Sequence, residues 1–337
     1  MAATKPRLII VGLDGATWDA ALPYIEAGRL PTLARFMRDG AWGTLNSIHP
    51  PETGCCWPTI FTGTNPGKHG VFGFFSLRPG TYERTSTTLA DWRMPPLWTL
   101  LNHAGMSAGV YNIPVTFPAE AIDGFMVSGE MGAPRVDDRL CASEPARNLI
   151  ASELTDYEIE PVNGRNRRRD AKRLRRQIEI RNRAAMALAR GIPTDALMVT
   201  VNYIDHAQHL FWDERLEGTA NPVLMAYEGA DRLLRSLMDL AGDECDVVVI
   251  SDHGSGPVEG YLDFDRMLSD LGYLDFIGAQ GGKARGGRVP QFLRPLAFRI
   301  FSRLPESLRG FARKAHGGRR VDYAATRLYS EIGRAHV

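Results

Sequence analysis

The sequence predicts an α/β fold with a mostly parallel central sheet, helices on both faces of that sheet, and insertions between its elements. Short β-branched runs alternate with helical stretches along most of the 337 residues, which is typical of a parallel sheet covered by helices. Apolar residues make up 44% of the chain and charged residues 23%, as in an ordinary globular protein with a large core. We therefore expect one α/β domain over residues 1–330.

The expected elements follow the chain in order. Strands are predicted at 7–13, 108–113, 125–128, 196–204 and 246–251, where apolar and β-branched residues cluster. Helical periodicity is predicted over 17–39, with a Pro/Gly interruption, over 222–241, and from Trp57 to Thr62. The stretch from about 75 to 190 is predicted to be an insertion.

Cysteine usage and hydropathy narrow the class of protein. The four cysteines are too few for a disulfide scaffold, and none lies in a CxxC spacing, so we expect a reducing compartment, the cytoplasm. The apolar runs are far shorter than the roughly 20 residues of a membrane span. A transmembrane or secreted protein is therefore not expected.

The net charge of +1 conceals two basic blocks. Residues 165–190 hold eleven Lys and Arg against two acids, and we interpret them as a helix with one apolar face and one solvated face. Residues 283–320, within a basic region at about 278–320, hold eleven Lys and Arg against one acid, with aromatic residues among them. That composition is consistent with peripheral contact with an anionic membrane or phosphate surface, whereas nucleic acid is not the expected partner.

The last seven residues, 331–337, read Glu-Ile-Gly-Arg-Ala-His-Val. They equal one translation of a common sequencing adapter, so we expect a non-native tail and a protein that continues past Ser330. An ordinary tail is the alternative.

Three aspartates follow three apolar runs. Asp14, Asp205 and Asp252 each come after a predicted strand, and ligand sites of open parallel sheets lie beyond the carboxyl ends of the strands. A single aspartate there is usually a helix cap. Here His209 lies four residues after Asp205, and His253 adjoins Asp252. Carboxylates with imidazoles favour Zn²⁺, with Mn²⁺ or iron as alternatives, and two such groups predict two ions of the kind that clamp a phosphoryl transfer.

The block 50–70 joins these motifs in a recognisable order. Together with Gly12-Leu13-Asp14-Gly15, the segment 112–118, Asp205…His209 and Ser251-Asp252-His253-Gly254, it resembles the alkaline phosphatase superfamily. The resemblance is to its type I phosphodiesterase and nucleotide pyrophosphatase branch and covers about residues 7–330. It implies an alkaline-phosphatase-like fold and a metal-dependent hydrolase of phosphoric esters.

The resemblance also implies a nucleophile. The family uses a Thr or Ser at a helix start about ten residues before a Thr-Gly pair, and Thr53 lies ten residues before Gly63. A metal can hold a threonine hydroxyl as its alkoxide, and a helix N-terminus offers N–H groups to phosphate oxygens. A plain helix cap is the alternative role of Thr53. Cys55 and Cys56 are rival nucleophiles that lack a base at a readable spacing, and His69 and His206 are expected to be structural.

By the same resemblance, one metal takes Asp14, Thr53, Asp252 and His253. The other takes Asp205, His209 and a third histidine near the family's C-terminus. Only His316 and His336 occur late in this chain, and neither has the family's surroundings. We therefore expect the third ligand to lie beyond the truncation and this chain to be less active than its parent.

The substrate is predicted only by class. Nucleotide-cleaving members often carry a phosphate-binding Asn where this sequence has Phe74, so we expect a phosphorylated small molecule or a lipid-like ester rather than a nucleotide. A same-fold phosphotransferase or mutase is the first alternative function. A catalytically inactive phosphate- or lipid-binding protein is the second.

Overall fold

The computed structural model describes residues 5–78, 81, 83–129, 136–153, 166–215, 221–258, 261–273 and 335–336. The chain divides into two compact units, residues 1–256 and 257–337. The first unit contains the central sheet and every predicted site residue. The second unit contains β8 (Tyr261–Leu262), α10 (Phe264–Asp270) and β9 (Ala335–His336), which pairs antiparallel with β8.

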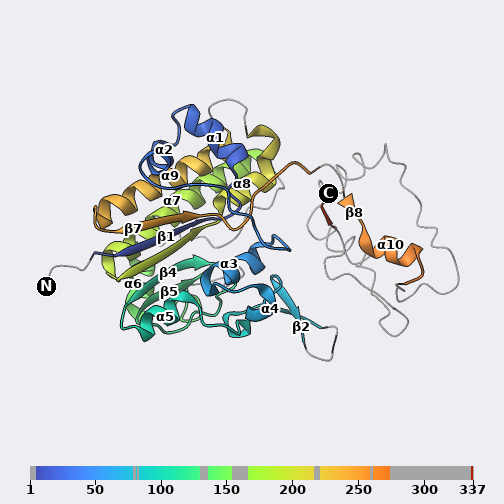
Figure 1. Ribbon diagram of the computed structural model, residues 1–337, viewed down its shortest axis with the longest axis horizontal. Helices are drawn as coiled ribbons and strands as arrows, with labels where there is room; N and C mark the ends of the chain where they lie inside the picture. Colours follow the sequence, from blue (N-terminus) through green and yellow to red (C-terminus); the bar gives the residue numbers. More distant parts are fainter. Residues whose placement is uncertain are drawn as a thin grey trace. The chain divides into compact units, whose positions relative to one another are not determined.

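Five strands form a parallel sheet in the order β5-β4-β6-β1-β7, and their arrows point the same way in Figure 1. The strands are β1 (Leu8–Leu13), β4 (Ala108–Ile113), β5 (Gly124–Ser128), β6 (Ala196–Val201) and β7 (Asp246–Ile250). This confirms the predicted fold class and all five strands. The predicted strand 196–204 is too long, because the chain turns into a helix at Tyr203.

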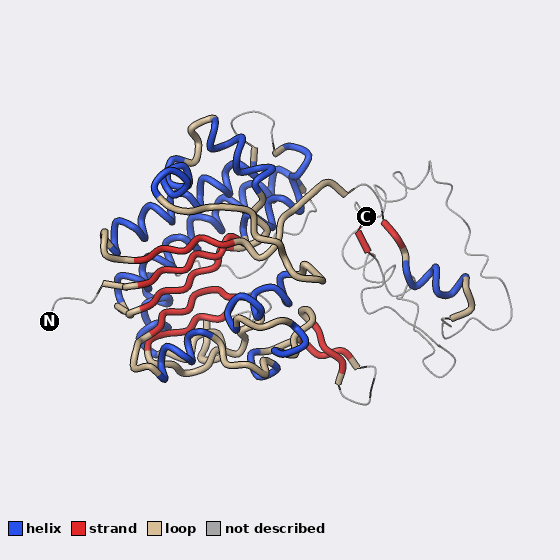
Figure 2. The backbone as a smooth tube through the Cα atoms, viewed as in Figure 1, coloured by secondary structure: helices blue, strands red, loops and turns tan. Residues whose placement is uncertain are grey.

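Helices cover both faces of this sheet (Figure 2). On one face they pack against Ile9, Val11 and Val199. These helices are α1 (Trp18–Glu26), α2 (Pro31–Asp39), α6 (Glu144–Glu153), α7 (Arg167–Gly191), α8 (Tyr203–Phe211) and α9 (Pro222–Ala241). On the other face Trp57, Phe61 and Trp98 pack against Val110 and Met198. That layer includes α3 (Thr53–Thr62), α4 (Pro66–His69) and α5 (Leu97–His103).

Two helix predictions change in detail. The predicted helix 17–39 is two helices, because Gly28 has a φ of +71° and Pro31 begins α2. The N-terminus of α2 is capped from α9, where the Asp231 carboxylate accepts from the N–H groups of Thr32 and Leu33 at 3.2 and 2.8 Å. This long-range cap ties the start of α2 to α9.

The range predicted as an insertion, 75–190, is part of the core. It contributes β4 and β5 to the sheet and α7 to the helical layer, besides a small hairpin of β2 (Phe75–Leu77) and β3 (Arg84–Ser86) and a 3₁₀ turn at Leu89–Asp91. A second 3₁₀ turn, Trp212–Glu214, follows α8. The strand pattern alone placed 108–113 and 125–128 in the sheet, so insertion was the wrong description for this range.

The first basic block forms α7 as predicted. Its apolar residues Leu174, Ile178, Ala185 and Leu188 are all buried, and most of its arginines lie on the opposite, exposed side.

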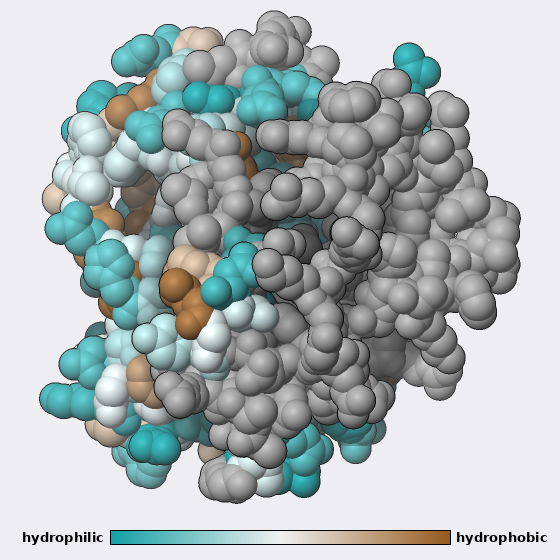
Figure 3. All heavy atoms as spheres, turned by 90° about the vertical axis from the view of Figure 1, so that its right-hand side faces the viewer, coloured by the Kyte–Doolittle hydropathy of each residue, from teal (hydrophilic) through white to brown (hydrophobic). Residues whose placement is uncertain are grey.

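On the face drawn in Figure 3 the coloured residues are mostly hydrophilic, with hydrophobic side chains only in small patches. No helix among the described residues is long and apolar enough to cross a membrane.

Several predictions fall on residues that the structure does not describe. The basic region at about 278–320 and His316 lie outside the described residues, so peripheral membrane contact stays a prediction. The single domain predicted over 1–330 and the non-native character of 331–337 stay predictions as well.

Candidate active site

Thr53 is the first residue of α3, at the carboxyl edge of the sheet. The helix begins after Glu52, whose backbone carbonyl accepts from the Cys55 N–H at 2.8 Å. Gly54 lets the following chain come close, since a Cβ there would lie 2.7 Å from the backbone nitrogen of Phe74. Thr53 therefore lies at a helix N-terminus, as the sequence predicted, with position 74 beside it.

The Thr53 hydroxyl contacts two of the predicted ligands. Its Oγ1 lies 2.9 Å from His253 Nε2 and 3.2 Å from Asp14 Oδ1. His253 Nδ1 lies 2.8 Å from the carbonyl oxygen of Gly254. Because a carbonyl only accepts, Nδ1 carries the ring proton, and Nε2 of a neutral imidazole and Asp14 Oδ1 are then alternative acceptors for the single Thr53 hydroxyl proton. The imidazole is thus oriented by its own backbone turn.

Asp252 completes this group. Asp14, Asp252 and His253 each offer one ligand atom, and these atoms all lie within 4.8 Å of one another. One Asp252 oxygen accepts from the Gly15 N–H at 3.1 Å, while Oδ2 is buried with no hydrogen-bond partner among the described residues. Burial raises the pKa of Asp252 to about 6. A buried, partly unsatisfied carboxylate beside a second carboxylate and an imidazole is a donor set that fits a divalent cation.

Asp205 and His209 form a second group in α8. Asp205 lies in the first helical turn rather than at the end of a strand, and its Oδ2 lies 3.3 Å from His209 Nε2. Burial acts to raise the pKa of Asp205, but the hydrogen bond and charge of His209 outweigh it, and the pKa is lowered. The same hydrogen bond raises the pKa of His209. The His209 side chain is 73% exposed, so one side of this pair is open to a further ligand.

Gly15 joins the two groups. Its N–H bonds to Asp252, and a Cβ on Gly15 would lie only 2.7 Å from Asp205 Oδ1. With a φ of +67° and no room for a side chain, this position requires glycine. All six residues that the sequence singled out therefore gather at one edge of the sheet, around Gly15.

A tryptophan that the sequence motifs do not single out lies beneath the site. Trp57 is fully buried, and its indole N–H donates to Asp14 Oδ2 at 3.1 Å. Gly12 makes room for it, because a Cβ there would lie 2.2 Å from Trp57 Cη2. The spacing of four residues from Thr53 puts Trp57 on the same side of α3, a signal that could have found it.

The rival groups are structural. Cys55 and Cys56 are buried, and burial raises the pKa of the two thiols to about 12 and about 11, so both stay protonated and unreactive at neutral pH. His69 is also fully buried, within 2.9 Å of the Thr59 hydroxyl, and its Nδ1 accepts from the Val71 N–H. These contacts support the structural role predicted for His69.

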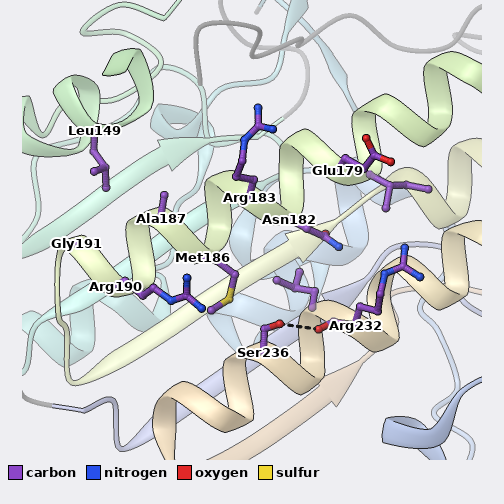
Figure 4. A pocket seen from close by; sticks show the side chains of 12 residues that line it. Leu149, Glu179, Asn182, Arg183, Met186, Ala187, Arg190, Gly191, Arg232 and Ser236 are labelled. Atoms are coloured by element: carbon purple, nitrogen blue, oxygen red, sulfur yellow. Dashed lines mark hydrogen bonds between the residues drawn. The ribbon is translucent and has the colours of Figure 1, made fainter. Parts of the chain in front are cut away.

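A separate cavity of about 660 Å³ lies between α6, α7 and α9 (Figure 4). Arg183, Arg190 and Arg232 line it together with Leu149 and Met186. These helices cover the sheet face opposite to α3, so the sheet separates this cavity from Thr53. None of the predicted site residues lines it.

The fold and the site together define an α/β protein with a threonine hydroxyl beside a cluster of two carboxylates and an imidazole at the carboxyl edge of its sheet. The chain belongs to the type I phosphodiesterase / nucleotide pyrophosphatase family, whose model matches residues 8–297. This confirms the family that the motifs indicated.

Solved structures give a second comparison. Phosphonoacetate hydrolase from Sinorhizobium meliloti 1021 in complex with phosphonoformate is 21% identical with a TM-score of 0.57. Its complex with phosphonoacetate is 20% identical with a TM-score of 0.53. Each alignment covers 80% of this chain but 63% of the hydrolase chain. At this identity the likeness establishes an alkaline-phosphatase-like fold and leaves the substrate open. No curated protein matches the chain.

Proposed function

We propose that this protein hydrolyses phosphoric esters through a covalent phosphothreonine on Thr53. The observation that carries the proposal is the Thr53 hydroxyl at the start of α3, within 2.9 Å of His253 Nε2 and 3.2 Å of Asp14 Oδ1. A threonine that served only as a helix cap would not need two ionisable partners. The family assignment to phosphodiesterases and pyrophosphatases supports the same reaction class.

The reaction has two balanced steps. In the first, the Thr53 oxygen loses its proton to solvent and forms a bond to phosphorus, while the bond from phosphorus to the ester oxygen breaks and that oxygen takes up a proton from solvent. In the second, water attacks the phosphothreonine, which releases the phosphate product and restores the hydroxyl. Backbone N–H groups at the start of α3 would bind non-bridging oxygens in both steps, and the Trp57 N–H holds Asp14 in place.

Two divalent cations, Zn²⁺ or alternatively Mn²⁺, are proposed as cofactors. Asp14, Thr53, Asp252 and His253 would hold one, and Asp205 and His209 would contribute to the other. When bound, such cations supply charge that lowers the pKa of a hydroxyl and stabilises the transferring phosphoryl group. Asp252 Oδ2, which has no hydrogen-bond partner among the described residues and lies 3.5 Å from His253 Nε2, supports the first site, as does the convergence of three ligand atoms.

Phe74 supports a substrate other than a nucleotide diester. Its backbone lies against Gly54, next to the nucleophile, and its ring offers no hydrogen bond to a phosphate oxygen. We therefore propose a phosphorylated small molecule or a lipid-like ester as the substrate. The cytoplasm remains the proposed location, and the four free thiols are consistent with it.

The test is to trap the intermediate. Wild-type protein is incubated with Zn²⁺ and p-nitrophenyl phosphate, bis-p-nitrophenyl phosphate or phosphonoacetate, quenched in acid and analysed by peptide mass spectrometry. We expect a phosphoryl adduct on Thr53, its loss in Thr53→Ala, and its retention in the matched variant Thr62→Ala. Thr62 lies in the same helix but bonds only to Pro58 and Thr64 among the described residues.

Turnover with an adduct on another residue, or turnover that survives Thr53→Ala, would refute the proposal. Repeating the assay with an added alcohol acceptor separates hydrolase from transferase. Free phosphate as the main product supports hydrolysis, and a phosphorylated acceptor supports the transferase alternative.

A further inference from the structure

The peptide unit of Gly15 is held from α8 by a buried amide. Gln208 is 2% exposed, and its Nε2 donates to the Gly15 carbonyl at 2.7 Å and to Ser255 Oγ at 3.0 Å. The Ser255 hydroxyl lies 3.3 Å from the same Gly15 carbonyl. The Gly15 N–H donates to Asp252, in the first group of ligands. Gly15 is thus bonded to Asp252 through its N–H and to Gln208 through its carbonyl.

The remaining side of the Gln208 amide is also occupied. The Tyr227 hydroxyl, on α9, accepts from the Thr17 N–H at 2.9 Å. Its own proton has two acceptors in reach, Gln208 Oε1 at 3.2 Å and the Thr17 carbonyl at 3.3 Å. Tyr227 is itself 1% exposed. The turn that follows Asp14 is thus attached at Gly15 and Thr17 to two helices, through one continuous hydrogen-bond network.

Gln208 lies in α8 between the two ligands of the second group, Asp205 and His209. It lies three residues after Asp205 and directly before His209, so a single rigid helical turn carries the second pair of ligands and the group that holds Gly15. Gly15 contacts both ligand groups, since its N–H is bonded to Asp252 and its Cα lies against Asp205. A displacement of Gly15 would therefore disturb both contacts at once. The distance between the two ligand groups therefore depends on the bond between Gln208 and Gly15.

We propose that Gln208 is a positioning residue that sets the spacing of the two ligand groups and so determines how tightly the site binds divalent cations. This inference rests on the proposed function. Only an amide satisfies the observed pattern, since it donates to Gly15 and Ser255 and accepts from Tyr227 through one side chain. A glutamate could accept from Tyr227, but it would face the Gly15 carbonyl with a second acceptor. A methionine would fill similar space with no donor.

The experiment compares the full chain with Gln208→Met, Tyr227→Phe and the control Tyr24→Phe. Tyr24 packs edge-to-face on Tyr227, but its hydroxyl bonds to Asn221 and Arg215 rather than to Gln208. Zn²⁺ affinity is measured by titration calorimetry, the coordination geometry by the visible spectrum of the Co²⁺ form, and the stability of the metal-free chain by urea unfolding. Residual p-nitrophenyl phosphatase activity gives kcat and KM.

Outer partners of metal ligands typically change metal affinity by about 10- to 100-fold. We expect Gln208→Met to weaken Zn²⁺ binding within that range, to alter the Co²⁺ spectrum, and to lower kcat with KM changed less than about twofold. Tyr227→Phe should shift affinity in the same direction by a smaller factor. Tyr24→Phe should leave affinity and spectrum as in the wild type, even where it lowers stability.

Zn²⁺ affinity and a Co²⁺ spectrum unchanged in Gln208→Met would overturn the proposal. If Gln208→Met does not fold, Tyr227→Phe becomes the deciding variant, and a Zn²⁺ affinity no lower than that of Tyr24→Phe would overturn the proposal. Asp252→Ala separates this result from the proposed function. If Asp252→Ala binds Zn²⁺ as the wild type does, the proposed metal site is wrong, whatever Gln208 shows.

Discussion

The contact between Gly12 and Trp57 gives a prediction whose size follows from the structure. A Cβ on Gly12 would lie 2.2 and 2.7 Å from two atoms of the Trp57 ring and 2.9 Å from Thr200 Oγ1. All three distances are shorter than a van der Waals contact, and Trp57 is fully buried. We expect Gly12→Ala to destabilise the fold by about 1–3 kcal/mol, the usual effect of overpacking a dense core.

Trp57→Phe should also destabilise the fold, because it removes a contact instead of adding an atom. It removes the N–H that donates to the buried Asp14 carboxylate, worth about 1.5–3 kcal/mol for a bond to a charged group. It also removes the two ring atoms that crowd position 12. In the double variant the new methyl group occupies part of that space, so its destabilisation should be at least about 1 kcal/mol smaller than the sum of the two single effects.

Urea unfolding of the metal-free chain, followed by far-UV circular dichroism, measures the three variants. Gly43→Ala is the control, because a Cβ at Gly43 meets nothing within 4 Å, and it should change the unfolding free energy by less than about 0.5 kcal/mol. Additivity of Gly12→Ala and Trp57→Phe within about 0.5 kcal/mol would contradict the packing that we describe. The same result would remove the argument that glycine at position 12 is there to admit Trp57.

Three further predictions concern the site. Thr53→Ser should keep measurable turnover while Thr53→Ala loses at least about 1000-fold in kcat, measured with p-nitrophenyl phosphate, because only serine retains a hydroxyl. Asp252 has a pKa of about 6 in the folded chain, above its ordinary value of 3.8, so between these pH values the folded state binds a proton that the unfolded state does not. The metal-free chain should therefore lose up to about 3 kcal/mol of stability as the pH rises from about 4 to above 6. Urea unfolding of Asp252→Asn across this range should show a flatter profile; an unchanged slope would assign the titration to another group. Phe74→Asn should raise kcat/KM for a nucleotide diester relative to p-nitrophenyl phosphate by about tenfold, the effect of one added hydrogen bond to a charged oxygen, and an unchanged ratio would show that position 74 does not select the substrate.

Periodicity predicted the sheet well because parallel strands are buried on both faces. Every residue of β4 and β6 is buried, so their apolar runs are continuous and easy to recognise. The boundary at Tyr203 was missed because Tyr203 and Ile204 extend the apolar run of β6, while the helix there depends on packing against α9 and the sheet. The helix 17–39 was read as one element for a similar reason, since its break depends on a turn and a cap from Asp231.

By itself the sequence singled out the residues that we propose carry the chemistry. Acids at the ends of apolar runs, histidines at short spacing and a threonine before a helix are local patterns, and the sheet topology forces Asp14, Asp205 and Asp252 to one edge. Only the tertiary structure decided how these groups are held. Trp57 beneath Asp14, the Gly15 peptide between the two ligand groups and Gln208 behind it are contacts between residues 43, 190 and 193 positions apart. No local pattern encodes such contacts, because each depends on the packing of α3 and α8 against opposite sides of the same strand end.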